Sequence, residues 1–521
     1  MKKIIVEVLH AGIKKLPKIN KAYDLSFFSE TIERTRDSSH GDFTSNIALR
    51  LAKSLKRNPR ELANEIFNCV PKNNAIEKIE VAGPGFMNFY LDDSAYHTEI
   101  ERILSKKNLI EKNKEFKKQK LLLEFVSANP TGPLHVGHGR HAAFGASLRN
   151  ILEAVGYDVK SEYYVNDSGR QMDILCISVI VHILQGENQK ISMPLAGYQG
   201  HYIKTISQAI KQKFDEDEIN IKELIPKIDD KDNQDQYIDC LIENTKRKIG
   251  IEKFNQIKNQ SLGLIKKDIQ DDLSEFGVLF DSWFSEESMD KNGELDKAIQ
   301  SLKKKNYLYE KDGATWFKAT DFNDEKDRVV IRKNQNKTYF TSDIVYHHNK
   351  KVRGFDTLID ILGSDHHGYI ARVKAGLEAM GHDSDDLDVQ LVQFVSLYEN
   401  GVKQAMSTRS GEFITLRQLR EEVGNDAARY FYIMRSNEQH LDFDLALAKS
   451  KTSENPVYYI QYAHARIASV INQLNEKSLK YDKKRGISNL QLLVTKKERE
   501  LMVSISRFSE ILFLSAKNKA P

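Results

Sequence analysis

Hydrophobic and polar residues recur with different periods along the chain, and these periods predict its first elements. Residues 59–66 (PRELANEI) have the spacing of a helix. Two runs typical of strands follow at residues 76–81 and 86–91, with Gly83-Pro84-Gly85 as the turn between them. We therefore expect the first 110 residues to form a small α+β domain. A polar stretch with seven lysines, residues 105–120, is the expected linker.

A run typical of a buried strand follows at residues 121–126 (LLLEFV), and a loop rich in Pro and Gly leads from it into a helical run over His135–Val155. Another strand-like run at residues 159–165 closes a β-loop-α-β unit, which implies a parallel sheet. Residues 185–305 are mostly helical and polar, so they are interpreted as an insertion between two halves of that domain. Strand signals return later, at residues 315–318, 329–332, 338–341 and 358–362.

Residues 414–448 and 456–521 have helical patterns. The sequence thus predicts a multidomain α/β protein: a catalytic domain with a parallel sheet of the Rossmann type and a helical insertion, an α+β N-terminal domain and an all-α C-terminal domain. The expected domains are residues 1–110, 111–185, 186–305, 306–448 and 449–521, of which the second and fourth are the two halves of the catalytic domain.

Composition narrows the class of protein. The chain has 521 residues, more than one hydrophobic core normally serves, so three or more domains are expected. Hydrophobic residues make up 40% and charged residues 29%, which is typical of a globular chain. No apolar run reaches the ~18 residues of a membrane helix, and the N-terminus lacks the pattern of a signal peptide. Three distant cysteines predict no disulfide framework and a reducing, cytoplasmic setting.

The net charge of +4 is unevenly distributed. Residues 1–110 carry 18 basic against 14 acidic side chains, and residues 449–521 carry 14 against 6, which leaves −8 for the middle. Two basic ends around an acidic body are typical of a catalytic domain whose ends bind a polyanion. The alternative is that the lysine-rich helices are simply solvated faces.

Residues 127–140 (SANPTGPLHVGHGR) hold the densest cluster of candidate chemistry, between a buried strand and a helix. Ligands bind at the carboxyl ends of parallel strands, and a helix N-terminus attracts anions. Gly137 and Gly139 would let a flat base lie on the backbone. His135 and His138 share one helix face and would donate hydrogen bonds to phosphate oxygens. A metal pair is the alternative, but no carboxylate of an HExxH pattern and no cysteine accompanies them.

These residues resemble the HIGH signature of class I aminoacyl-tRNA synthetases, and specifically bacterial arginyl-tRNA synthetases, to which SANPTGPL is also similar. Residues 40–43 and 82–89 are similar to the extra N-terminal domain of that family, which contacts the tRNA elbow. The other segments in register span most of the chain: 163–171 (YYVNDSGRQ), 198–203 (YQGHYI), 281–286 (DSWFSE), 339–344 (YFTSDI), 363–369 (GSDHHGY) and 454–459 (ENPVYY).

The resemblance implies an arginine–tRNA ligase that works in two steps. Arginine and ATP would form arginyl-adenylate and pyrophosphate, and the arginyl group would then pass to the 3′ end of the tRNA specific for arginine. The implied partners are arginine, ATP with Mg²⁺ and that tRNA, with no membrane and no structural metal, in a chain expected to be a monomer in the cytoplasm.

The resemblance also implies an arginine pocket. Its expected carboxylates are Glu124, within the apolar strand LLLEFV, and Asp343, at the end of a strand-like run. Tyr339 would stack on the guanidinium plane, and Ser127 and Asn129 would hold the α-amino or carboxylate group. For Glu124 the alternative is a carboxylate on an edge strand that faces solvent.

The ATP side would include the end of another strand, with Gly363, Asp365, His366 and His367. His347 and His348 lie nearby, but adjacent residues of the expected strand point to opposite faces, so no structural metal is proposed there.

The second signature of the family, KMSKS, departs from its pattern here. Residues 403–411 read KQAMSTRSG, so both signature lysines are replaced, by Ala405 and Thr408. Arg409 is the expected substitute cation, because arginine binds phosphate in a fork and stays charged. Lys403 is a weaker candidate, and Met406 and Ser407 keep the ATP-side positions.

The C-terminal region resembles a helical anticodon-binding domain. Tyr458, Tyr459 and Tyr462 would stack on unpaired bases and Arg466 would contact the tRNA. For Tyr459 and Tyr462 a place in the core is the open alternative. The family's domain continues past Pro521, so a truncated chain is expected. Two other functions compete: an HxGH nucleotidyltransferase that acts on a small molecule, and a tRNA-binding module that has lost catalysis.

Overall fold

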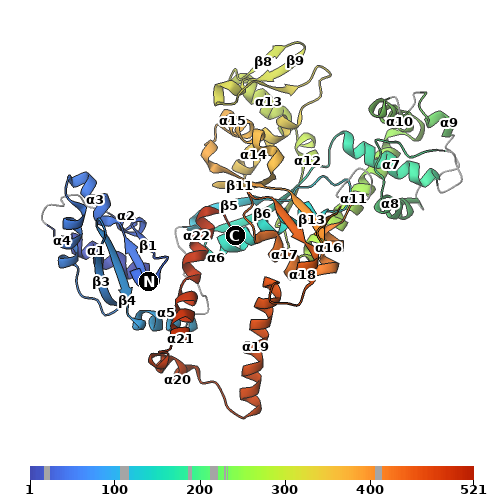
Figure 1. Ribbon diagram of the computed structural model, residues 1–521. Helices are drawn as coiled ribbons and strands as arrows, with labels where there is room; N and C mark the ends of the chain where they lie inside the picture. The colour runs from blue at the N-terminus through green and yellow to red at the C-terminus, as the bar shows by residue number, and fades with distance from the viewer. Residues whose placement is uncertain are drawn as a thin grey trace. The chain divides into compact units, whose positions relative to one another are not determined.

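The computed structural model describes residues 1–16, 24–105, 116–185, 191–211, 221–227, 230, 233–404 and 413–521 (Figure 1). The chain divides into two compact units. The first comprises Met1–Glu111 with Ala468–Leu514, and the second comprises Lys112–Ile467 with Ser515–Pro521. This division does not follow the five domains expected from the sequence, whose limits stay predictions.

The first unit is built on a four-stranded antiparallel sheet of order β1-β2-β4-β3. Its strands are β1 (Ile32–Arg34), β2 (Phe43–Ser45), β3 (Ile76–Ala82) and β4 (Phe86–Leu91), and its N-terminal helices are α1 (Lys2–Ile13), α2 (Leu25–Glu30), α3 (Ile47–Leu55), α4 (Pro59–Cys69) and α5 (Asp93–Ser105). The α+β prediction and the strands on both sides of the Gly-Pro-Gly turn are confirmed. Gly85 is required there, because its φ is 132° and a Cβ would lie 2.8 Å from the Pro59 carbonyl oxygen.

Helices from the far end of the sequence complete this unit. They are α20 (Lys483–Ser488), α21 (Lys496–Ser506) and most of α22 (Phe508–Asn518). Met502 of α21 lies in the core of the N-terminal sheet and helices, and Arg499 forms an ion pair with Asp93 of α5 at 2.8 Å. The predicted N-terminal and C-terminal domains are therefore packed together in part.

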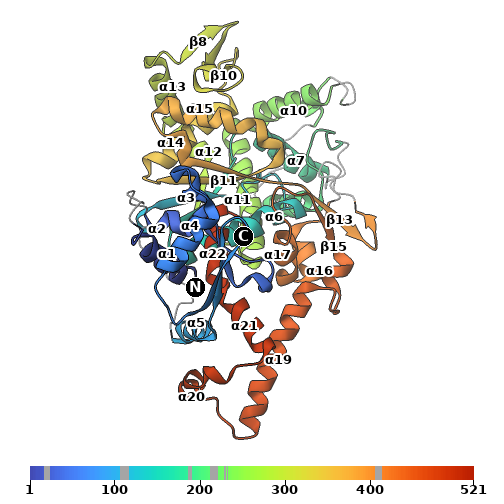
Figure 2. The same ribbon diagram turned by 60° about the vertical axis from the view of Figure 1, so that its left-hand side comes forward.

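The second unit contains a five-stranded parallel sheet of order β12-β11-β5-β6-β7. The strands are β5 (Lys120–Glu124), β6 (Asp158–Val165), β7 (Ser282–Ser285), β11 (Thr357–Gly363) and β12 (Leu387–Val392), and the flanking helices are α6 (Val136–Val155), α14 (Tyr339–Val352) and α15 (Ile370–Met380). Figures 1 and 2 show α14 and α15 on one face of the sheet and α6 on the other. After β5 the chain forms β6 and β7 on one side of this strand, and it later forms β11 and β12 on the other side. The carboxyl ends of β5 and β11 therefore form the topological switch point, where α/β sheets bind ligands.

The helical insertion follows β6 as predicted. Its helices are α7 (Arg170–Gln185), α8 (His201–Lys211), α9 (Ile221–Leu224), α10 (Gln234–Ile249) and α11 (Ile251–Glu275). The prediction of a helical insertion up to residue 305 missed β7, which is the edge strand of the parallel sheet.

A small antiparallel sheet of order β10-β9-β8 follows. It consists of β8 (Leu308–Lys311), β9 (Ala314–Phe317) and β10 (Arg328–Ile331), after helices α12 (Glu286–Lys291) and α13 (Glu294–Lys304). The strand predicted at residues 338–341 is wrong. Helix α14 begins at Tyr339, because Phe340 and Ile344 bury the same helical face in a core with α15 and the small sheet. Asp343, His347 and His348 therefore lie on a helix and not on a strand.

The region after the parallel sheet mixes short strands and helices. A sheet of order β14-β13-β15 contains β13 (Val395–Glu399), β14 (Val402–Lys403) and β15 (Leu441–Asp444), and the helices are α16 (Leu416–Val423), α17 (Asn425–Ile433), α18 (Leu445–Lys449) and α19 (Pro456–Glu476). The helical prediction for residues 414–448 missed β15. Short 3₁₀ turns complete the described elements: η1 (Ser38–His40), η2 (Phe116–Lys118), η3 (Ala319–Phe322), η4 (Ser364–Tyr369), η5 (Ser384–Asp386) and η6 (Leu490–Leu492).

Candidate active site

The chain makes a strained turn where β5 ends at the switch point. Val126 and Ser127 have φ angles of 70° and 41°, in the left-handed region that a β-branched residue such as valine rarely adopts. The Ser127 hydroxyl donates to Glu124 Oε1 at 2.9 Å and accepts the Tyr164 N–H at 3.1 Å. Such strain is typical of sites whose geometry is fixed by their surroundings, and here it turns the chain into the loop of the predicted signature.

His135 and His138 cap the start of α6 and hold one another. His135 Nδ1 accepts the N–H groups of Gly137 and His138 at 3.0 and 3.3 Å, and His138 Nδ1 accepts the His135 N–H at 3.3 Å. The rings stack with centroids 3.6 Å apart. Because each Nδ1 is an acceptor, each neutral ring carries its proton on Nε2. Burial lowers the pKa of both histidines, so two neutral N–H donors are available at neutral pH.

A pocket of about 660 Å³ opens beside these rings. Its wall includes Asn129 and Thr131 of the loop, Arg170 of α7 and Tyr198. Asn129 Oδ1 accepts a hydrogen bond from Asn166 Nδ2 at 3.1 Å. The structure thus brings the loop, the two histidines and the start of the helical insertion to one cavity large enough for a nucleotide-sized ligand.

The two glycines of the signature differ in their surroundings. A Cβ on Gly137 would meet the His135 ring at 2.9 Å, so glycine is needed for the capping geometry. Gly139 is buried, and a Cβ there would meet Tyr432 Oη at 2.6 Å and Leu416 at 2.7 Å. The interpretation of Gly139 as a platform for the base is therefore wrong: its missing side chain lets α16 and α17 pack closely against α6.

The residues that follow the second signature in sequence, Thr415 and Leu416, lie next to the first signature. Leu416 N–H donates to the Leu134 carbonyl at 2.8 Å, and Thr415 pairs with His135 in an isolated antiparallel bridge. Lys403 is an exposed residue of β14. Met406, Ser407 and Arg409 lie outside the described residues.

Glu124 is buried on a central strand, with β11 and β6 on either side. The alternative of a solvent-facing edge strand is wrong. Its carboxylate accepts a hydrogen bond from Lys350 Nζ at 2.6 Å. Glu124 also lines a small pocket together with Asp343, Tyr164 and Tyr346. Glu124 thus already has a cation, which the sequence did not predict.

Asp343 and Glu286 form a second, unbalanced pair of carboxyl groups. Burial, then Glu286 and Glu124, raises the pKa of Asp343 well above its ordinary value, and burial raises that of Glu286. Within the described part of the chain, the buried oxygen Oε2 of Glu286 has no hydrogen-bond partner. Glu286 ends the motif at residues 281–286 (DSWFSE), but no role is predicted for it from the sequence. The missed signal is its place directly after β7, at the same sheet edge as Glu124.

The remaining candidates lie around this edge. Tyr339 begins α14 and is 55% exposed. Gly363 ends β11, and Asp365, His366 and His367 follow it in η4, all exposed. The pair His347 and His348 does not point to opposite faces of a strand. On α14, His347 is buried against Asp360, and His348 bonds His382 at 2.8 Å.

Arg140 fixes the helix of the first signature to the segments around β13. It is 1% exposed and donates to the backbone carbonyls of Gln393, Ser436 and Gln439, each at 2.8 Å. We expect Arg140→Met to lower the free energy of unfolding by about 3 kcal/mol, because buried carbonyls lose their donors. Calorimetry measures this loss. The exposed Arg332 provides the control variant Arg332→Met, and equal stability of the two variants would contradict the expectation.

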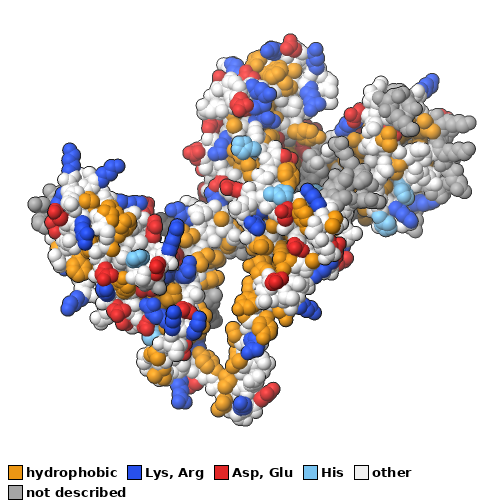
Figure 3. All heavy atoms as spheres, in the orientation of Figure 1, with side chains coloured by type: hydrophobic (Ala, Val, Ile, Leu, Met, Phe, Trp, Pro, Cys, Tyr) orange, Lys and Arg blue, Asp and Glu red, His pale blue; other side chains and the backbone are white. Residues whose placement is uncertain are grey.

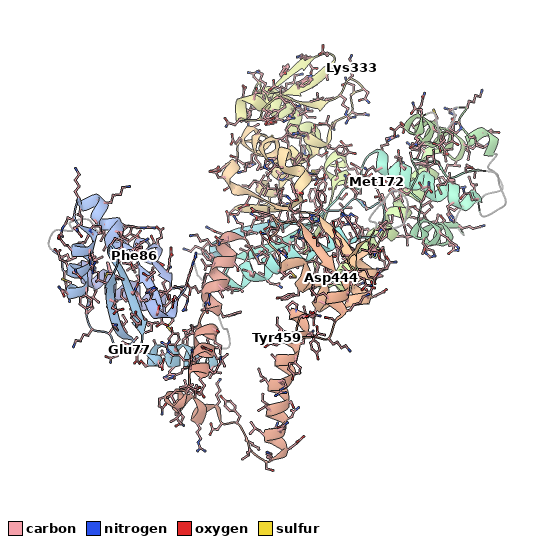
Figure 4. All side chains as sticks on the ribbon, in the orientation of Figure 1. Glu77, Phe86, Met172, Lys333, Asp444 and Tyr459 are labelled. Atoms are coloured by element: carbon pink, nitrogen blue, oxygen red, sulfur yellow. The ribbon has the colours of Figure 1, made fainter. Side chains whose placement is uncertain are left out.

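Exposed aromatic side chains follow the first turns of α19. Tyr459 is 60% and Tyr462 47% exposed, so the alternative that they belong to the core is wrong. Arg466 lies over the Tyr462 ring at 5.8 Å and donates to its hydroxyl at 3.1 Å. The Tyr458 ring stacks near Tyr462 with centroids 6.3 Å apart. Figure 4 labels Tyr459 on this helix, and Figure 3 shows hydrophobic side chains gathered along it.

The parallel sheet, the histidine pair at the helix N-terminus and the strand-end pocket define a class I aminoacyl-tRNA synthetase. The family model described as tRNA synthetases class I (R), catalytic domain, matches residues 99–468. The arginyl tRNA synthetase N terminal domain matches residues 3–91, and the DALR anticodon binding domain matches residues 460–521.

Curated relatives agree. An arginine–tRNA ligase of Legionella pneumophila (strain Paris) is 50% identical over 496 residues, which is 94% of this chain and 84% of the relative. The arginine–tRNA ligase of Hydrogenovibrio crunogenus is 46% identical over 528 residues, or 99% and 89%. The chain belongs to the arginyl-tRNA synthetase family. It is an ATP-dependent arginine–tRNA ligase, and the alternatives of a small-molecule nucleotidyltransferase and of a module without catalysis are wrong.

Solved structures support the fold. A putative arginyl-tRNA synthetase from Campylobacter jejuni aligns with a TM-score of 0.68 and 30% identity over 82% of this chain and 86% of its own. The arginyl-tRNA synthetase of Thermus thermophilus aligns with a TM-score of 0.69 and 18% identity over 100% and 88%. Among the described residues, no helix is both long and apolar enough to cross a membrane.

Proposed function

We propose that arginine binds at the carboxyl ends of β5 and β7, with its guanidinium group between Asp343 and Glu286. The observation that carries this proposal is a pair of carboxyl groups without an ion pair in the described part of the chain. Glu124 has Lys350, whereas Glu286, which acts on the nearby Asp343, meets only hydroxyl groups and keeps its buried Oε2 without a partner. Two carboxylates match the forked donors of a guanidinium, whereas unpaired they are costly to bury. Tyr339 covers the open side of the guanidinium plane.

The other end of arginine is assigned to residues near the strained turn. Glu124 faces the α-amino group, and Ser127 and Asn129 orient the α-amino and carboxylate groups. The Ser127 hydroxyl already bonds both Glu124 and the Tyr164 backbone, so its position is fixed before arginine arrives. This arrangement directs the arginine carboxylate toward the cavity beside His135 and His138, where ATP binds with Mg²⁺ as a substrate complex.

The first step needs positioning and charge stabilisation rather than a protein nucleophile. One carboxylate oxygen of arginine attacks the α-phosphorus, the bond to the β-phosphate oxygen breaks, and pyrophosphate leaves. His135 and His138 donate from Nε2 to oxygens of the phosphates as charge builds up. In the second step a ribose hydroxyl of the tRNA 3′ end attacks the carbonyl carbon of arginyl-adenylate, and AMP leaves.

The ATP side also includes Gly363, Asp365, His366 and His367 at the end of β11, together with Lys403, Met406, Ser407 and Arg409 of the second signature. On α19, Tyr458, Tyr459, Tyr462 and Arg466 contact the tRNA, and the exposed aromatic rings stack on unpaired bases. We assign a monomeric state and a cytoplasmic location to the protein as part of the same proposal.

Arginine-dependent ATP–pyrophosphate exchange in the presence of tRNA tests the amino-acid site. Citrulline has nearly the shape of arginine but a neutral urea group, so it leaves both carboxylates without a cation. We expect citrulline to support exchange at least ~10³-fold less efficiently than arginine, because a site with unpaired buried polar groups rejects the analogue that lacks their partner. Lysine, a cation without the fork, is the control for charge alone. Efficient exchange with citrulline would contradict the assigned carboxylates.

A further inference from the structure

Three buried carboxylates form one row across the parallel sheet. In the register of the strands, Asp360 of β11 lies opposite Glu124 of β5, and Glu124 lies opposite Glu162 of β6. The three side chains are 3%, 7% and 0% exposed. Like charges directly opposite one another in a sheet repel, and buried carboxylates are costly unless they are paired. The row therefore requires cations from the layer that covers it.

Helix α14 and its C-cap residue Arg353 supply these cations. Lys350 Nζ bridges Glu124 and Asp360 at 2.6 and 2.7 Å, and Arg353 binds Glu162 with a fork of 2.6 and 2.7 Å. Although burial favours the neutral amine, Asp360 and Glu124 raise the pKa of Lys350, which keeps it charged. Lys350 and Arg353 balance two of the three negative charges.

The third partner of the row is His347, and both of its ring nitrogens face oxygen atoms. Nδ1 lies 2.7 Å from the Asp343 backbone carbonyl, and Nε2 lies 2.7 Å from Asp360 Oδ2. A carbonyl oxygen only accepts, so Nδ1 carries a proton. Burial alone would raise the pKa of Asp360, but the Lys350 ammonium, 2.7 Å from Asp360 Oδ1, lowers it. Asp360 is thus ionised and also accepts, which requires a second proton on Nε2.

We propose that His347 is a buried imidazolium cation, the third positive charge of a neutral six-member network, and that it is a positioning residue for arginine binding. Its ring joins Asp360 of the sheet to the backbone of Asp343, so the network fixes the start of α14 relative to β5. This inference rests on the proposed arginine site, because Asp343 and Glu124 belong to that site.

The groups that face His347 come from several elements. Asp343, Tyr346 and Lys350 lie on its own helix, and the Tyr346 ring centroid is 5.6 Å from that of the imidazole. Asp360 lies on β11, and the same pocket is lined by Glu124 of β5, Tyr164 of β6, Tyr369 of η4 and the apolar Leu387 and Val389 of β12. Among these groups, the positive charge of Lys350 disfavours a charged His347, whereas the carboxylates favour it. Three carboxylates along the row face three basic side chains, and this charge balance favours the charged imidazole ring.

Nitrogen NMR of the full chain labelled with [¹⁵N]histidine tests the charge directly. One of the fifteen histidines should keep both N–H protons at pH 8.5, where an ordinary imidazole is neutral. The signal should be absent from His347→Gln, whose spectrum assigns it. If no side chain remains an imidazolium at pH 8.5, the proposal is wrong. The spectrum needs no arginine, so this outcome does not depend on the proposed function.

Pyrophosphate exchange then tests the positioning role. His347→Gln removes one positive charge, and we expect the KM for arginine to rise about 30-fold while the KM for ATP stays within twofold. The double variant His347→Gln/Asp360→Asn restores the charge balance, so it should recover to within about threefold of the wild-type KM.

The matched control is His348→Gln, on the same helix but bonded to His382, which should change neither KM by more than about twofold. An unchanged KM for arginine in His347→Gln, or a double variant worse than the single one, would overturn the positioning role. If Asp343→Asn leaves arginine use intact while the imidazolium is present, the arginine site fails and the charge assignment stands.

Discussion

Replacing Asp343 by asparagine should lower kcat/KM for arginine by about 10³-fold, because the guanidinium would lose half of its buried ion pair. The asparagine amide has the same shape as the carboxylate, so the packing around α14 is kept. It carries no charge, however, and its NH₂ group presents two donors to the guanidinium, which only donates. Glu286→Gln should have a similar effect. Since both carboxylates bind one guanidinium, the double variant should lose less than the product of the single losses.

Pyrophosphate exchange with varied arginine measures these losses, and Asp290→Asn is the matched control. Asp290 lies on α12 with Glu286, but its side chain is 64% exposed and pairs with Lys337 at the surface. Wild-type KM in Asp343→Asn, or an equal loss in Asp290→Asn, would place the guanidinium elsewhere.

The raised pKa of Asp343 gives this site a pH dependence. Burial, then Glu286 and Glu124, hold the pKa of Asp343 in the free site well above its ordinary value, although Lys350 and Arg372 oppose them. Arginine requires the ionised form, and its affinity should therefore increase as pH rises through the pKa of the free site. For the same reason Asp343 destabilises the free enzyme more as pH rises above the pKa of this carboxyl group in the unfolded chain. Arginine should therefore stabilise the fold more at higher pH.

The sequence predicted the strand before the signature, the loop and the helix after it, because each of these has a strong local pattern. LLLEFV is an unbroken buried strand, and the glycines and prolines that follow allow only a loop. Strand β7 was missed because its four residues (SWFS) are short and lie at the sheet edge, where the pairing with β6 is made across more than a hundred residues. Helix α14 was mistaken for a strand because Tyr, Phe and Thr favour strands, whereas the contacts of Phe340 and Ile344 favour the helix.

The prediction of a strand in place of α14 limited how much of the site could be predicted from the sequence. On a strand, His347 and His348 would lie on opposite faces, and Lys350 would be part of a solvated polar run. On a helix, His347 and Lys350 share a face with Tyr346 and Arg353, and together they meet the row of carboxylates. The ion pair of Lys350 and Glu124 joins residues 226 positions apart, so no local pattern predicts it.

His135→Asn should lower kcat for adenylate formation by about 10²-fold without destabilising α6. Asparagine is a favourable N-cap, and its Oδ1 can accept the N–H groups that His135 Nδ1 accepts now. Its Nδ2 amide is a donor, but it ends closer to the backbone than His Nε2–H, so the developing phosphate charge loses a stabilising hydrogen bond. The substitution therefore separates the structural role of the side chain from its chemical one.

Single-turnover adenylate formation and thermal unfolding, measured on the same preparations, distinguish the two roles. His135→Leu loses both the cap and the donor, so it should lose activity and about 1 kcal/mol of stability. Because burial lowers the pKa of His135, the wild-type rate should hold on acidification until the ring is protonated below the ordinary histidine range. Stability should fall first, as pH drops below the ordinary histidine pKa, because the unfolded chain then binds a proton that the folded ring excludes. Activity should fall only at the lower pH where the folded ring is protonated, since the hydrogen on Nδ1 then breaks the cap. A wild-type rate in His135→Asn would show that the ring serves only to begin the helix, and that His138 alone faces the phosphates.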